Sequence, residues 1–400
     1  MIESKARGGD RGFLIGGVVM LAVAMGVGRF AYTPLLPVME RDAGLTVATA
    51  GALAFSNLLG YLVGAALAIM PFTHRRRLVI VRWAIAGVIV TTALMAAASS
   101  FWLPLRFLTG VSSGFVLVFA SSIVLERAAH RNLPAWPPLF FSGVGIGIAF
   151  SGVAVPLFAN VGGSRAAWIG IAFCSALATG LTFRWFVDDA PAASLLPSPI
   201  GAHLPKQRVT FRWLAAVYTG EAFAYIIPAT FLVAIVNQVP AIARFAALSW
   251  VLVGLAGALA TFPWIHAAAR LGKARALALA LGIQAVGILA PIVSDAAVAV
   301  VFAAFALGGT FMAITLFAAG LARDMFPQRT SAAMSRLTVL YGVGQMVGPL
   351  VATQLALHSG SYSAALLCAA AAAAIAALTT LLAVREPSLE TPGATALPTA

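Results

Sequence analysis

Long apolar stretches alternate with short polar ones along almost the whole chain. Each apolar stretch is close to, or longer than, the roughly 20 residues that a helix needs to cross the hydrocarbon layer of a membrane. The pattern therefore predicts an all-α polytopic membrane protein with twelve transmembrane helices. These helices are expected at residues 13–39, 46–72, 78–98, 103–125, 139–159, 166–187, 211–237, 245–267, 274–293, 296–319, 337–357 and 362–384.

One polar stretch is longer than the others and divides the twelve segments into six and six. Residues 188–210 are rich in Pro, Ala and Ser. We expect them to form a loop between an N-terminal six-helix bundle at 13–187 and a C-terminal six-helix bundle at 211–384. The flanking tails would be residues 1–12 and 385–400, and the second tail, rich in Pro, Thr and Ala, is expected to be disordered.

The composition supports a membrane protein, and the distribution of charge argues against nucleic-acid binding. The 400 residues are 61% hydrophobic and only 9% charged, whereas a soluble domain is about 25% charged. The net charge of +13 comes from basic residues scattered through short loops, without the continuous tract that nucleic-acid binding favours. The first apolar run is too long for the core of a cleaved signal peptide, so it is interpreted as a retained span.

The basic residues are divided unevenly between the two sides of the predicted bundle. Only Arg41, Arg165 and Arg244 fall in the loops of one side, and most of the others fall in the loops of the opposite side. Because loops rich in Lys and Arg stay in the cytoplasm, both tails and the central loop are expected there. We expect a multi-pass protein of the bacterial inner (plasma) membrane, embedded in the lipid bilayer and acting as a monomer.

The second half of the chain echoes the first at a nearly constant offset. Phe30-Ala31-Tyr32 recurs 193 residues later as Phe223-Ala224-Tyr225, and each triplet is soon followed by a proline. Other short matches follow in the same order, which indicates two homologous six-helix halves, as in transporters with parallel repeats. By this offset, Glu221 is equivalent to Gly28.

Several stretches carry family information. Residues 28–37 read GRFAYTPLLP, with Pro34 and Pro37; residues 57–64 read NLLGYLVG; residues 225–232 read YIIPATFL; residues 342–349 read GVGQMVGP, with Gly348 and Pro349; and Arg106 stands four residues before Gly110. Together they resemble the Major Facilitator Superfamily (MFS), and more narrowly its YbfB/YjiJ-type branch. The resemblance implies two six-helix bundles related by a pseudo-two-fold axis, with the first and seventh helices lining a central cavity.

Two ionisable residues lie deep in the predicted spans and are candidates for a proton-coupling site. Arg29 is ten residues from the end of the first segment, and Glu221 is nine residues from Arg212. At a helical rise of about 1.5 Å per residue, both fall near the middle of the hydrocarbon layer. Glu221 is the only carboxylate of the twelve that lies deep inside a predicted span, where ionisable groups are costly and functional by default.

Three roles remain open for this pair. Glu221 is expected to carry a proton, with Arg29 as its modulator, because burial favours the neutral acid while a nearby guanidinium favours the carboxylate. A static Arg29–Glu221 pair that holds the halves together is the structural alternative. A third possibility is that Arg29 binds an anionic group of the solute directly, since its planar fork suits carboxylate or phosphate.

Polar and aromatic side chains expected around these two residues extend the candidate site. Tyr218 and Tyr225 share a helical face with Glu221, and phenols around an ionic group suit a pocket for a small organic solute. The candidate solute-binding residues are Arg29, Tyr32, Thr33, Asn57, Tyr218, Tyr225 and Gln345.

Three further side chains have both a structural and a functional interpretation. Asn57 and Gln345 are amides inside spans, and each either lines the cavity or makes an interhelical hydrogen bond. Arg106 lies near the outer end of its span, where snorkelling toward the interface is the favoured interpretation.

The remaining residues give no sign of an enzyme. There is no Walker loop with its lysine, and the histidines are too dispersed for a metal site. We therefore expect no catalytic activity, cofactor or metal. The prediction is secondary active transport of a small organic solute, coupled to protons, by rocking of the two bundles. A non-transporting membrane sensor or scaffold on the same fold is the alternative.

Overall fold

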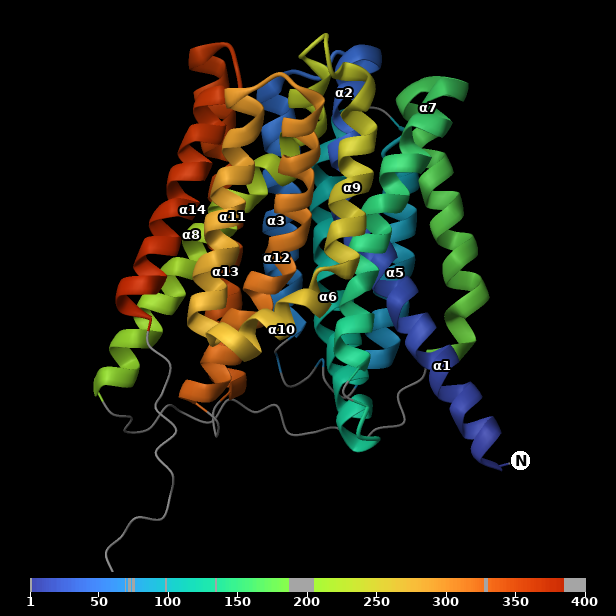
Figure 1. Cartoon of the computed structure of the whole chain (residues 1–400). Coiled ribbons are helices and arrows are strands. Elements are labelled where there is room, and N and C mark those ends of the chain that lie inside the picture. The colour runs from blue at the N-terminus through green and yellow to red at the C-terminus, as the bar shows by residue number, and fades with distance from the viewer. Residues whose placement is uncertain are drawn as a thin grey trace, which may run out of the picture.

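The chain folds into a single bundle of helices that run side by side (Figure 1). This computed structural model describes residues 2–68, 70, 73, 76–97, 99–133, 135–186, 205–326 and 330–384. Residue ranges 187–204 and 385–400, which hold most of the expected central loop and the expected C-terminal tail, lie outside the described residues. The start of α1 and the end of α14 lie at one end of the bundle, here named the terminal end (Figure 1); the opposite end is named the distal end.

The first half of the chain contains the helices up to residue 185. They are α1 (Ile2–Leu21), the π-helix η1 (Ala22–Phe30), α2 (Tyr32–Ala43), α3 (Val47–Ala68), α5 (Arg77–Leu94), the 3-10 turn η2 (Ser99–Phe101), α6 (Trp102–His130), α7 (Trp136–Thr182) and the 3-10 turn η3 (Phe183–Trp185). Helix α1 begins at Ile2, so the residues expected to form the N-terminal tail are helical from there on.

The second half begins within the expected loop. Its elements are α8 (Pro205–Asn237), the 3-10 turn η4 (Ala243–Phe245), α9 (Ala246–Leu259), α10 (Thr261–Leu271), α11 (Lys273–Val293), α12 (Ala297–Met325), α13 (Thr330–Ser359) and α14 (Ser363–Ala383). Residues 205–210 extend α8 toward the terminal end and are therefore part of a helix, not of the loop.

Two elements explain how the helices relate to the expected spans. Ten helices in the described residues are long and apolar enough to cross a membrane, and α9 with α10 forms one further candidate, bent by 56°. Helix α7 is counted once, but it leaves helical geometry at Gly162 and at Gly163, whose φ of 64° suits a residue without a Cβ. Figure 1 shows its two arms running in opposite directions. With both arms of α7 and the bent pair counted, the described chain offers twelve candidate crossings by length and composition.

Small residues let helices approach to backbone contact within the first half. A Cβ atom placed on Gly60 would lie 2.0 Å from the carbonyl oxygen of Phe107, and one on Gly110 would lie 2.0 Å from the carbonyl oxygen of Asn57. Such distances leave no room for a side chain. Helices α3 and α6 therefore pack through two glycine pairs, Gly60 with Gly64 and Gly110 with Gly114, each spaced by four residues. Gly110 of the fourth-segment motif thus has a packing role.

The two halves meet mainly along three helix pairs: α2 with α8, α3 with α13, and α7 with α9. On the first pair the carbonyl of Ala229 accepts a hydrogen bond of 2.5 Å from the Thr33 hydroxyl. On the third pair the Trp250 indole donates to the Ser151 hydroxyl at 3.1 Å. Thr33 belongs to α2, which forms the distal half of the first span (Figure 1), so these bonds close the bundle toward its distal end.

Ion pairs gather at the terminal end. Arg77 pairs with Glu126 at 2.7 Å between α5 and α6, and Lys273 pairs with Asp324 between α11 and α12. Asp10 of α1 accepts from Arg127 at 2.8 Å and from Arg131 at 3.0 Å. Among the described residues, Asp10, Glu126 and Asp324 are therefore each paired with a cation of their own half.

Candidate functional site in the core of the bundle

The first span is interrupted where its arginine and prolines lie. Residues 22–30 form the π-helix η1, and α2 resumes at Tyr32. Pro34 and Pro37 have no N–H to donate to the helix. Just before them the Arg106 guanidinium binds the backbone, donating to the carbonyl of Gly28 at 3.0 Å and to that of Arg29 at 3.4 Å.

Arg106 therefore does not snorkel. Its side chain is only 2% exposed, and its guanidinium carbon lies 4.9 Å from the centre of the Tyr32 ring. The expectation was wrong because the position of a residue along a span does not reveal which way it points. The broken backbone of the first helix offers Arg106 more hydrogen-bond acceptors than the apolar route to the interface does.

Arg29 crosses from the first half to the second. Its Nη2 donates to the Tyr225 hydroxyl of α8 at 3.0 Å, and its guanidinium carbon lies 5.0 Å from the centres of the Phe30 and Tyr61 rings. The Gln345 amide of α13 donates to the same Tyr225 hydroxyl at 2.5 Å. Within the described residues Arg29 has no carboxylate partner, and its Nε has no hydrogen bond.

Glu221 is enclosed by its own half. It is 0% exposed. Its Oε1 accepts from the Gln284 amide of α11 at 3.5 Å, and Gln284 in turn accepts from the Thr310 hydroxyl of α12 at 3.2 Å. The Tyr341 phenol of α13 lies beside the carboxyl, and Oε2 has no hydrogen-bond partner in the described part of the chain.

Arg29 and Glu221 do not form an ion pair in the described residues. The hypothesis of a static pair between the halves is therefore wrong for this conformation. Tyr225 accepts a hydrogen bond from Arg29, its ring stacks on that of Tyr341, and Tyr341 lies beside Glu221. Two neighbouring phenols thus lie between the arginine and the carboxyl.

Tyr341 is the residue that sequence reasoning missed. Its ring stacks on Tyr218 with 4.2 Å between centroids and on Tyr225 with 5.9 Å. The Tyr218 hydroxyl is within 3.3 Å of the Thr315 hydroxyl. A signal was available, since Tyr341 lies four residues before Gln345 and thus shares its helical face.

The other candidate residues join helices in this conformation. The Tyr32 hydroxyl donates to the Ala50 carbonyl at 3.0 Å, and the Asn57 amide donates to the Arg106 carbonyl at 3.0 Å. Asn57 and Gln345 were each expected either to line the cavity or to make an interhelical hydrogen bond. Both make interhelical hydrogen bonds, and Asn57 also borders a space of about 20 Å³ beside Arg29. This space is smaller than a solute, so the core is closed around the site.

Gly348 and Pro349 of the last motif shape α13. A Cβ on Gly348 would lie 2.3 Å from the Ile226 side chain of α8, and Pro349 lies inside the helix. Gly348 thus permits the approach of α13 to α8 that brings Gln345 to Tyr225. These motif residues position the polar network from the opposite side to Pro34 and Pro37.

Two helical bundles with a buried, ionisable core are the architecture of a membrane transporter that works by alternating access. The family profile described as "Uncharacterised MFS-type transporter YbfB" matches residues 21–381. The chain belongs to this family of the Major Facilitator Superfamily.

Solved structures confirm the fold. The crystal structure of a mutant of the nucleoside transporter NupG is similar to this chain with a TM-score of 0.74 and 13% sequence identity, covering 93% of this chain and 100% of that one. At this identity the likeness shows the fold and leaves the solute open. A comparison with curated protein sequences finds no significant match.

Proposed function

We propose that this transporter moves a small organic solute in exchange for, or together with, protons, by rocking of its two halves. Glu221 is the proton-carrying group, and Arg29 is its modulator or the contact for an anionic part of the solute. The protein acts as a monomer in the bacterial inner membrane with both termini in the cytoplasm. The terminal end of the bundle is then the cytoplasmic end, as the distribution of basic loops supports.

The observation that carries the proposal is the environment of Glu221. A fully buried carboxyl group with a free oxygen and no cationic partner in the described residues is expensive in its charged form. It can ionise without that cost only if the bundle rearranges to admit water or a cation. Proton binding is thereby tied to conformation, which is the requirement for coupled transport.

The position of Arg29 suggests how the protonation of Glu221 is coupled to the movement of the two halves. The bonds from Arg29 to Tyr225 and from Thr33 to Ala229 both join the first half to α8. Rocking that opens the distal end separates these groups, whereas Glu221, Gln284 and Thr310 move together within one half. A change at Glu221 reaches the interface between the halves through Tyr341 and Tyr225.

A role for Arg29 in holding an anionic group has a separate support. Its Nε is without a hydrogen bond and faces no carboxylate in the described chain, so its planar fork has free donors. Arg29→Lys keeps the charge but loses the fork. We expect this variant to weaken transport of anionic solutes while sparing neutral ones, and an equal loss for both would contradict the role.

The deciding experiment measures proton flux in proteoliposomes for the parent and Glu221→Gln across a panel of organic solutes. Gln keeps the size and hydrogen-bonding capacity of the side chain but cannot ionise. We expect solute-driven proton flux to disappear in Glu221→Gln. The matched control is Glu40→Gln, which removes a carboxyl from the same fold at the distal end of α2 and should leave flux unchanged.

Two outcomes would count against the proposal. Proton flux that survives Glu221→Gln would remove Glu221 from the mechanism. A parent protein that binds solutes but moves neither solute nor protons would favour the alternative, a membrane sensor or scaffold built on the transporter fold.

A further inference from the structure

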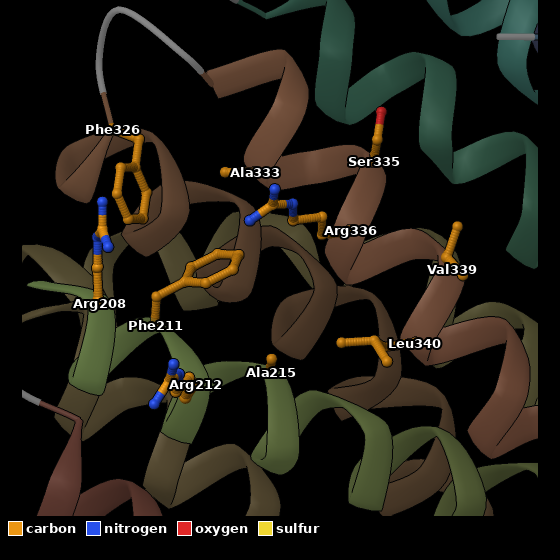
Figure 2. Close-up of a pocket in the computed structure, with 10 residues that line it drawn as sticks. All are labelled: Arg208, Phe211, Arg212, Ala215, Phe326, Ala333, Ser335, Arg336, Val339 and Leu340. Carbon is orange, nitrogen blue, oxygen red and sulfur yellow. The ribbon is translucent and has the colours of Figure 1, made fainter. Parts of the chain in front are cut away.

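A second site is formed at the terminal end, outside the polar network. A cavity of about 710 Å³ lies between α8 and α13 and reaches Phe326, which follows α12. This volume is within the range of pockets that hold organic ligands, roughly 300–1,000 Å³. Figure 2 shows the residues that line it: Arg208, Phe211, Arg212, Ala215, Phe326, Ala333, Ser335, Arg336, Val339 and Leu340.

Helical spacing explains why these residues face one space. On α8, Arg208, Arg212 and Ala215 are separated by four and three residues, which places them on one side of the helix. On α13, Arg336 and Leu340 are likewise four residues apart. Figure 2 shows the Arg336 side chain extending from α13 toward Phe211 on α8. Cations from two helices thus converge on one cavity.

The three arginines differ from several other cations of the terminal end. Arg77, Arg127 and Lys273 each pair with a carboxylate. No residue lining the cavity is acidic, and no ion pair of Arg208, Arg212 or Arg336 is formed within the described part of the chain. Within the described residues, the three arginines that line the cavity therefore have no acidic partner.

The walls of the cavity are apolar. Phe211 and Phe326 meet edge to face with 5.2 Å between their centroids, and Val339 and Leu340 form the side provided by α13. An inorganic anion would use the cations but not these walls. A neutral apolar molecule would use the walls but leave the guanidinium groups unpaired. The lining matches a molecule that combines both properties.

The cavity also leads toward the proton site. From Arg208 to Ala215 it extends about 10 Å along α8, at 1.5 Å per residue. Ala215 is one turn before Tyr218, and Leu340 directly precedes Tyr341. Tyr218 stacks on Tyr341, and Glu221 lies a further turn along α8. The inner end of the cavity at Ala215 is thus about two helical turns from Glu221.

From these observations we infer that the cavity is a recruitment site for organic anions, which carry a carboxylate, sulfonate or phosphate on an aromatic or aliphatic body. The inference rests on the proposed function in so far as it names the class of solute. Acidic phospholipid shares this chemistry, and its headgroup is the competing source of the anion. The experiment below is arranged to separate the two.

The test uses a pair of probes with one body and different charge, 2-naphthoate and 2-naphthamide. Equilibrium binding to the full-length protein is measured by calorimetry in nanodiscs of phosphatidylcholine. We expect saturable 2-naphthoate binding that weakens by at least about tenfold in Arg208→Gln/Arg212→Gln/Arg336→Gln, while 2-naphthamide binding stays unchanged.

Three comparisons keep the result interpretable. Arg270→Gln removes an exposed charge from the same end outside the cavity and should bind 2-naphthoate like the parent. Arg336→Lys keeps the charge and should lose less affinity than Arg336→Gln. Glu221→Gln should bind 2-naphthoate normally, because Glu221 lies beyond the tyrosine stack, so failure of proton coupling and failure of this site are distinguishable.

Four outcomes would overturn the inference. They are absence of saturable 2-naphthoate binding to the parent, equal weakening of both probes in the triple variant, the same weakening in Arg270→Gln, and loss of 2-naphthoate binding when phosphatidylglycerol is added to the nanodiscs. The last outcome would assign the cavity to lipid.

Discussion

The same structural position carries different chemistry in the two halves of the molecule. In the first half, a Cβ on Gly28 would lie 2.8 Å from the Val88 side chain and 2.9 Å from the Ser113 hydroxyl. In the second half, Glu221 meets Gln284, and Gln284 meets Thr310. Gly28 and Glu221 are separated by 193 residues and Val88 and Gln284 by 196, and Thr310 lies one residue before the position that corresponds to Ser113.

The comparison teaches how a duplicated fold divides its tasks. In the first half, glycine leaves the position without a side chain, and neighbouring helices pack into the space. The Ser113 hydroxyl donates to the carbonyls of Ala24 and Thr109. The second half places a carboxyl, an amide and a hydroxyl in the same space. The first half instead contributes cations: Arg106 to its own broken helix, and Arg29 to the partner half.

The largest loss of stability is expected from Arg106→Ala. This change tests the arginine that binds the backbone of the first span and has no counterpart in the second half. The repeat places Ala304 at the equivalent position of the second half, where α8 passes Pro228 without a break in its helix. Removing Arg106 deletes its hydrogen bonds to two buried carbonyls and leaves a cavity in the core, and we expect a loss of at least about 3 kcal/mol of stability. Thermal unfolding in detergent measures it.

The control for this change is Arg165→Ala, an exposed arginine at the distal end. Its effect should stay within about 0.5 kcal/mol. If Arg106→Ala were tolerated equally well, the carbonyls of Gly28 and Arg29 would have to find other partners, and the special need of the first half would be refuted.

A medium effect is expected from Gly28→Ala, which tests the packed, side-chain-free version of the position. The added methyl group would meet Val88 and Ser113 well inside normal contact, so we expect a net loss of about 1–2 kcal/mol from overpacking. Val88→Ala in the same chain should recover part of this loss. The melting temperature of the purified protein reports both.

Gly220→Ala is the matched control, because it lies beside Glu221 and a Cβ there meets nothing within 4 Å. In a helix this change should be neutral or stabilising by up to about 1 kcal/mol. A destabilisation of Gly220→Ala equal to that of Gly28→Ala would show that crowding by Val88 and Ser113 is not the cause.

The smallest effect on stability is expected from Tyr341→Phe, which sharpens the comparison on the side of function. The repeat places Ser142 at the corresponding point of the first half, so only the second half has a phenol there. The ring stack with Tyr218 survives the change, and we expect less than about 1.5 kcal/mol of destabilisation. Coupled proton flux should nonetheless fall, because Glu221 loses the phenol hydroxyl beside it.

Tyr362→Phe provides the control for Tyr341→Phe. The Tyr362 ring stacks on Phe231, and its hydroxyl has no hydrogen-bond partner in the described chain. Flux in proteoliposomes should therefore be unchanged in Tyr362→Phe. Equal flux in the parent and Tyr341→Phe would contradict a role for the phenol pair.

The spans could be predicted from sequence because a membrane demands a simple pattern. The turn at Gly162 and Gly163 falls between two predicted segments, although the helix is assigned without a break. The repeat likewise paired Gly28 with Glu221, and the neighbours of both residues agree with that pairing. The length of each span and the order of the spans follow directly from the apolar and polar residue types along the chain.

Direction around a helix could not be predicted in the same way. Residue counting placed Arg29 and Glu221 at similar depth, but each residue turns the side chain by about 100° around the axis. Glu221 faces α11 and α12, while Arg29 faces α8. The inward orientation of Arg106 and the role of Tyr341 could not be predicted for the same reason, since both depend on which groups of neighbouring helices each side chain faces.

The contact between α7 and α9 has a consequence for the speed of transport. A Cβ on Gly145 would lie 2.3 Å from the Ala258 nitrogen, and one on Gly254 would lie 2.2 Å from the Ala149 nitrogen. The halves thus touch here through main-chain atoms, which have no rotamers to exchange when one helix shifts against the other. In kinetic terms, this seam adds little to the activation barrier of rocking, and larger residues at either glycine would slow the turnover of the transporter.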